Sequence, residues 1–136
     1  MRIGIIGAGK VGKAFGLFLK DRGECLKGYT SRTQASAVMA AELTDSEAFQ
    51  NPMALIREVE LIFLTVVDDQ IEVLARVLSE TLSSLGTNAM RSGKLGPGKV
   101  DVSISSNFES PIFVHMSGAH GVDALEPLAA AGFETA

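Results

Sequence analysis

The chain has 136 residues, one cysteine and a formal net charge of −4 at pH 7. This length fits one domain with its own hydrophobic core, and the lone Cys25 excludes an intrachain disulfide. The charges are spread without a basic run, which argues against nucleic acid as a partner. The apolar segment near the N-terminus is too short to cross a membrane, so we expect a cytoplasmic protein that does not bind a membrane. No second cysteine or histidine cluster offers the spacing of metal ligands, so we expect no metal site.

The first strand leads directly into a glycine triplet. Residues 2–12 read RIGIIGAGKVG, and Gly7, Gly9 and Gly12 have the spacing G-x-G-x-x-G. In dinucleotide-binding domains the first glycine permits a tight turn, the second brings the pyrophosphate to the backbone, and the third lets the helix approach the strand. An ordinary strand-to-helix turn is the alternative, which the flanking strand and helix disfavour. The predicted cofactor contacts are Gly7, Ala8, Gly9, Lys10, Val11 and Gly12.

The elements that follow alternate between strands and helices. This alternation predicts an α/β fold with a doubly wound, mainly parallel Rossmann-type sheet and helices on both faces. A capping box of Asp69 and Glu72 is expected to open the fourth helix. We expect strands over Ile3–Ile6, Cys25–Thr30, Leu61–Val67 and Ile112–His115, the start of a sixth strand at Phe133–Ala136, and helices over Val11–Arg22, Gln34–Glu42, Pro52–Glu58, Ile71–Leu82 and Val122–Ala131.

Residues 86–110 interrupt this pattern. They are rich in Gly, Ser, Asn and Pro, although Val100, Val102 and Ile104 alternate like a short strand. The segment is longer than the usual connection within a compact domain. We expect an irregular insertion in a dinucleotide-binding domain that spans residues 1–136, with a mobile loop, an added hairpin and an incorrect strand assignment as the alternatives.

The residues after the second strand indicate which nucleotide the domain binds. NAD-selective domains carry an Asp or Glu about 20 residues past the glycines, and this chain has Ser31, Arg32 and Thr33 there. Hydroxyls and a guanidinium suit a 2′-phosphate, so NADP is favoured over NAD. The missing carboxylate also argues against a methyltransferase. As alternatives, Ser31 or Thr33 caps the next helix, and Arg32 is solvated or stacks on adenine.

Four segments together suggest a family: RIGIIGAGKVG at 2–12, TSRT at 30–33, FLTVVDDQI at 63–71 and HMSGA at 115–119. They resemble the Rossmann-like oxidoreductases related to pyrroline-5-carboxylate reductase and 6-phosphogluconate dehydrogenase, in the branch whose second domain has no assigned function. The resemblance implies that Thr65, Val66 and Val67 contact the cofactor on its nicotinamide side.

The resemblance further implies that His115 and Ser117 lie near the substrate as catalytic residues. A histidine can transfer protons near neutral pH, and a serine hydroxyl can bind a substrate carbonyl or carboxylate. A hydrogen-bonded histidine at a strand end, beside a helix-capping serine, is the alternative.

The function implied is that of an NADP-binding domain of an oxidoreductase, which moves hydride between nicotinamide and a small carbonyl, imine or hydroxyl substrate. Family members carry a second, mostly helical domain that closes the substrate cleft and often forms a dimer. Its residues would lie beyond Ala136, so we expect this chain to be a fragment of a protein that forms a homo-oligomer through that domain. The alternatives are a non-catalytic dinucleotide-binding or redox-sensing module, and a domain that binds no nucleotide.

Overall fold

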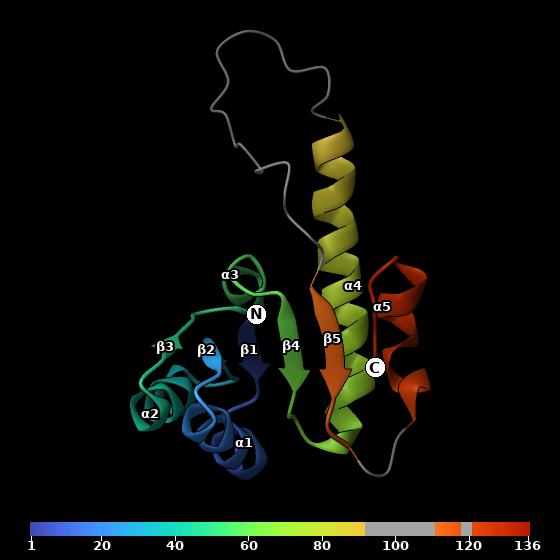
Figure 1. Ribbon diagram of the computed structural model, residues 1–136. Coiled ribbons are helices and arrows are strands. Elements are labelled where there is room, and N and C mark those ends of the chain that lie inside the picture. Colours follow the sequence, from blue (N-terminus) through green and yellow to red (C-terminus); the bar gives the residue numbers. More distant parts are fainter. Residues whose placement is uncertain (92–110, 118–120) are drawn as a thin grey trace, which may run out of the picture.

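A parallel five-stranded sheet organises the structure, a computed structural model that describes residues 1–91, 111–117 and 121–136. The strand order is β3-β2-β1-β4-β5, and every pair of neighbours is parallel. The predicted fold class is therefore confirmed (Figure 1). The elements are β1 (Arg2–Ile6), α1 (Lys10–Asp21), β2 (Cys25–Thr30), α2 (Gln34–Thr44), β3 (Glu47–Ala48), α3 (Pro52–Ile56), β4 (Leu61–Leu64), α4 (Asp68–Arg91), β5 (Ile112–His115), a 3-10 helix (Val122–Leu125) and α5 (Glu126–Ala130).

The central strands bury side chains on both faces of the sheet. Ile3 and Ile5 of β1 pack with the core beneath α1 and α2, whereas Ile62 and Leu64 of β4 pack with the core beneath α3, α4 and α5. Alternate residues of a strand point to opposite faces, so short apolar runs supply both cores. This two-sided burial explains why the apolar segments of the sequence predict a covered parallel sheet.

The strand order reverses beside β1, and this reversal places the site. From β1 the chain proceeds outward to β2 and β3, then crosses back to β4 on the other side of β1. Ile6 pairs in register with Thr30 of β2 and with Leu64 of β4. The segments that follow these three strands therefore begin at one level, where open α/β sheets bind ligands.

The boundaries of β4 and α4 differ from the prediction. The strand expected over Leu61–Val67 ends at Leu64, although the Thr65 amide still donates to Ile6 O at 2.9 Å. Helix α4 already begins at Asp68, so Asp69 lies inside the first turn and the prediction that it is the N-cap is wrong.

Helix α4 is also longer than expected, with 24 residues that extend past the sheet (Figure 1). Residues 86–91, which we expected to begin the insertion, form the C-terminal end of α4. The rest of that segment, 92–110, with the alternating valines and isoleucine, lies outside the described residues.

The C-terminal segment departs from the expected single helix over Val122–Ala131. A 3-10 helix ends at Leu125 and α5 starts at Glu126, because Pro127 has no amide hydrogen with which to continue one α-helix. The start of a sixth strand is confirmed by a parallel bridge between Phe113 and Thr135. The two-residue strand β3 was not expected, since so short a pairing leaves no alternation in the sequence.

Candidate functional site

An open cavity of about 450 Å³ lies at the carboxyl ends of β1, β2 and β4. It is bounded by the turns after these three strands, by one face of α4 and by the first residue of α3. In the part of the chain that the structure describes, no acidic residue lines it. The lining residues are Ile6, Gly7, Ala8, Gly9, Thr30, Ser31, Arg32, Pro52, Thr65, Val66, Val67, Gln70, Val73, Leu74 and Val77.

The turn after β1 is fixed by close contacts at two of its glycines. Gly7 has a φ of +115°, which L side chains rarely adopt, and a Cβ there would lie 2.9 Å from backbone atoms of Thr65. A Cβ at Gly12 would lie 2.1 Å from Gly7 O. A tight turn and close packing of α1 on the strand therefore both require glycine at these positions.

Gly9 has a different environment from the other two glycines. A Cβ at Gly9 would meet nothing within 4 Å, and the residue has an extended backbone that any side chain can adopt. Because Gly9 lines the cavity, the missing side chain leaves its backbone open to a group in that cavity. Lys10 and Val11, predicted as contacts, are exposed in the first turn of α1, and the cavity lining does not include them or Gly12.

The turn after β2 contributes two of its three predicted residues. Ser31 and Arg32 line the cavity, and Arg32 is exposed. Thr33 is the N-cap of α2: its hydroxyl accepts from the Ser36 amide at 3.3 Å and donates to Ser36 Oγ at 2.7 Å. The capping alternative thus describes the position of Thr33, which the cavity lining does not include.

The segment after β4 supplies the wall opposite the β2 turn. All three predicted residues, Thr65, Val66 and Val67, line the cavity. Thr65 is buried, and its hydroxyl donates to Gly7 O at 2.8 Å. Burial decreases along the segment, and Val67 is 68% exposed.

One face of α4 forms a wall of the cavity, and the sequence motifs did not predict it. Val73 and Val77 line the cavity although they are 53% and 52% exposed. Together with Gln70 and Leu74 they follow the i, i+3, i+4, i+7 spacing of a single helix face. The signal in the sequence was an apolar stripe on this helix that is wider than contact with the sheet requires.

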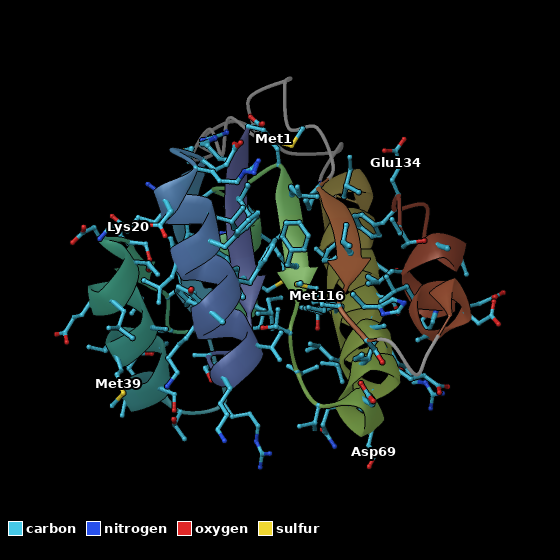
Figure 2. All side chains as sticks on the ribbon, turned by 60° about the horizontal axis from the view of Figure 1, so that its bottom comes forward. Met1, Lys20, Met39, Asp69, Met116 and Glu134 are labelled. Atoms are coloured by element: carbon cyan, nitrogen blue, oxygen red, sulfur yellow. The ribbon has the colours of Figure 1, made fainter. Side chains whose placement is uncertain are left out.

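His115 is the last residue of β5 and Ser117 lies two residues further on, and the cavity lining includes neither. The Ser117 amide donates to His115 Nδ1 at 3.2 Å, so the ring proton is on Nε2, which lies 3.0 Å from Gly121 O. Both ring nitrogens therefore have backbone partners, as in the alternative of a hydrogen-bonded strand-end histidine. Met116, labelled in Figure 2, marks where this segment leaves the sheet.

Two further observations on the described residues concern metal sites and membrane-spanning helices. Within ranges 1–91, 111–117 and 121–136, no group of three or more His, Cys, Asp or Glu residues is placed to hold a metal ion. Over the same ranges, no helix combines the length and apolar character that crossing a membrane requires.

A parallel sheet whose order reverses at β1, with a cavity at the carboxyl ends of the strands there, defines a Rossmann-type α/β domain. The chain belongs to the Rossmann-like domain family, whose model matches residues 1–134. A search of curated proteins gives no significant match.

Solved structures similar to this chain include several oxidoreductases. Arogenate dehydrogenase from Synechocystis is 23% identical with a TM-score of 0.62, over 98% of this chain and 39% of that one. An imine reductase from Pseudomonas sp. is 19% identical with a TM-score of 0.59, over 96% and 36%. Shikimate 5-dehydrogenase from Thermus thermophilus, solved with NADP(H) and shikimate, is 17% identical with a TM-score of 0.57, over 98% and 41%. These similarities show the fold, and the chain spans between 36% and 41% of the length of these proteins.

Proposed function

We propose that this domain binds NADP as part of an oxidoreductase that transfers hydride between nicotinamide and a small carbonyl, imine or hydroxyl substrate. The observation that carries the proposal is the convergence of three predicted segments on one cavity. Residues 7–9, 31–32 and 65–67 are far apart in sequence, and all of them line it. Oxidoreductases among the solved structures of the same fold support this choice of chemistry.

The lining residues fit the parts of a dinucleotide. Gly9 leaves backbone open beside the N-terminus of α1, where free N–H groups and the helix dipole favour a pyrophosphate. Val66 and Val67, with the α4 valines, offer apolar surface to the rings. Because Gly9 has no side chain, a pyrophosphate can reach its backbone without displacing one.

The residues after β2 support NADP over NAD. Ser31 and Arg32 line the cavity, and no carboxylate stands among its described lining residues to bind a ribose 2′-hydroxyl. The first turn of α2 has no acidic residue either. A guanidinium with a neighbouring hydroxyl can bind a phosphate by charge and hydrogen bonds, whereas a carboxylate would repel it.

In this proposal a bound NADP supplies the hydride chemistry. The protein's own residues orient the cofactor: the glycine turn holds the pyrophosphate, Ser31 and Arg32 hold the 2′-phosphate, and Val66 and Val67 exclude water beside the nicotinamide half. The relation to pyrroline-5-carboxylate reductase and 6-phosphogluconate dehydrogenase is part of this proposal and rests on the sequence motifs. A small-molecule substrate, assembly through a C-terminal domain and a cytoplasmic location are predictions of the same kind.

Calorimetric titration with NADPH and NADH tests the proposal. We expect NADPH to bind at least tenfold more tightly than NADH, about 1.4 kcal/mol, and Arg32→Ala to abolish this preference. Arg57→Ala is the matched control, because Arg57 is exposed at the end of α3 and outside the cavity lining. If neither NADPH nor NADH binds, the result contradicts the proposal.

A non-catalytic dinucleotide sensor is the second candidate. The observation that favours it is that both ring nitrogens of His115 have backbone partners, which leaves neither free for proton transfer in this conformation. Turnover assays with NADPH and a panel of small carbonyl and imine compounds, on a protein extended past Ala136, separate the two. Tight NADPH binding without turnover would favour the sensor, and turnover that His115→Asn removes would favour catalysis.

A further inference from the structure

The peptide groups of the glycine turn are held from both neighbouring strands. The Gly7 amide donates to Thr30 O of β2 at 2.8 Å. On the other side, Gly7 O accepts the Thr65 hydroxyl at 2.8 Å, in the segment that follows β4. A second contact of the same hydroxyl, to Ile6 O, is 3.4 Å long.

Thr65 also packs against the helix that begins after the turn. A Cβ at Gly12 would lie 2.7 Å from Thr65 Oγ1, so the hydroxyl fits between the first and third glycines of the motif. The residue is only 9% exposed, which keeps this bond away from bulk water. A buried hydroxyl bond of this kind is costly to leave unmade, so it constrains the turn.

The bond to Gly7 O has a consequence for the next amide. In a trans peptide the carbonyl and the following N–H point in opposite directions. With Gly7 O directed at Thr65, the Ala8 N–H is directed away from Thr65. Ala8 and Gly9 both line the cavity, so this peptide plane sets which backbone donors a ligand meets there.

We propose that Thr65 is a positioning residue for the pyrophosphate-binding turn. Its hydroxyl fixes the Gly7–Ala8 peptide plane and so presents the amides of the turn to the ligand. This inference rests on the proposed nucleotide function, and it assigns the Thr65 side chain a role through the backbone rather than a direct cofactor contact.

Three variants test the proposal. Thr65→Val removes the hydroxyl and keeps the shape of the side chain, whereas Thr65→Ser keeps the hydroxyl. Ser79→Ala is the control, because the buried Ser79 hydroxyl also donates to a backbone carbonyl at 2.8 Å, in α4 and outside the cavity lining. Each variant is titrated with NADPH and with adenosine 2′-monophosphate, which has the 2′-phosphate but no pyrophosphate.

We expect Thr65→Val to weaken NADPH binding at least tenfold and to leave binding of adenosine 2′-monophosphate unchanged. Thr65→Ser and Ser79→Ala should both bind NADPH within about threefold of the wild type. Wild-type NADPH affinity in Thr65→Val would overturn the proposal. Equal weakening of both ligands would overturn it as well, because it would mean general damage to the domain.

A ligand-free measurement separates this inference from the proposed function. Amide hydrogen exchange at Gly7, whose N–H donates to Thr30 O at 2.8 Å, should be faster in Thr65→Val than in the wild type, and Thr65→Ser should restore the wild-type rate. If the wild type binds no NADPH, the proposed function fails, and the exchange rates still decide the role of Thr65. Unchanged exchange in Thr65→Val would overturn that role.

Discussion

At the scale of single residues, the three glycines of one motif have unequal structural demands. Gly12→Ala places a Cβ 2.1 Å from Gly7 O, a backbone atom that cannot move without disturbing the turn. We expect this variant to lose about 1–3 kcal/mol of unfolding free energy, as overpacking usually does, and to lose NADPH binding with it.

Gly9→Val should separate stability from binding. Its side chain enters open space beside the cavity, so only the N-cap preference for glycine over valine is lost, about 1 kcal/mol or less. NADPH binding should disappear because the side chain occupies the approach to the backbone. Urea denaturation and calorimetry on both glycine variants check these expectations, and retained binding by Gly9→Val would contradict them.

Tyr29 gives a pH dependence that can be measured without interference, because it is the only tyrosine and the chain has no tryptophan. Its side chain is fully buried, and its hydroxyl donates to Gly12 O at 2.9 Å. Burial raises the pKa of Tyr29 from 10.0 to about 12, although a hydrogen bond with Thr44 opposes part of this increase.

The raised pKa means that the fold favours the neutral phenol. The unfolded chain ionises first, so this contribution to stability is complete below pH 10 and is lost as the pH rises from 10 to about 12. Tyrosinate absorbance should show a midpoint near the upper value, and Tyr29→Phe should remove this part of the alkaline loss of stability. A midpoint near pH 10 in a protein that is still folded would refute the assignment.

Spacing in the sequence was enough to identify the turn residues Gly7–Gly9, Ser31 and Arg32 of the cavity. It could not show that Thr33 caps α2 while Ser31 lines the cavity, because both carry hydroxyls in the same short turn. Nor could it show the direction of the Thr65 hydroxyl, which depends on a contact between residues 58 positions apart.

At the scale of elements, α4 takes part in both the core and the cavity. Ile71, Ala75 and Leu78 are buried against the sheet, whereas Val73 and Val77 face the cavity with about half of their surface exposed. The apolar face of this helix is therefore wider than core packing alone explains.

Val77→Asp tests this wall of the cavity. We expect at least fivefold weaker NADPH binding, because an apolar contact is lost and a negative charge is added near an anionic ligand. Stability should change little, since Val77 is 52% exposed. Met39→Asp is the control: Met39 is 56% exposed on α2, where Figure 2 shows it at the outer surface. Equal NADPH affinity in the two variants would argue against the α4 wall.

The type of most elements was predictable, and their ends were less so. Asn51 and Pro52 marked the start of α3 correctly, because the Asn51 side chain accepts the Ala54 amide at 2.9 Å. The apolar run after Glu60 continued past the end of β4, since Val66 and Val67 serve the cavity and not the sheet. Hydrophobicity alone does not distinguish these two uses of a valine.

At the scale of the whole molecule, the site is a product of topology. The three segments that line the cavity meet only because β1 lies between β2 and β4, with Ile6, Thr30 and Leu64 in register. Alternating strands and helices predicted such a sheet, and the general rule for open α/β sheets predicted where a ligand would bind. The volume of the cavity depends on side-chain packing and was accessible only from the structure.

A crystal structure of this protein with NADPH tests the central claim most directly. We expect a nucleotide in the cavity at the ends of β1, β2 and β4, with its pyrophosphate at the Ala8 and Gly9 backbone and its 2′-phosphate beside Ser31 and Arg32. An empty cavity in crystals saturated with NADPH, or a nucleotide bound at another surface, would contradict it.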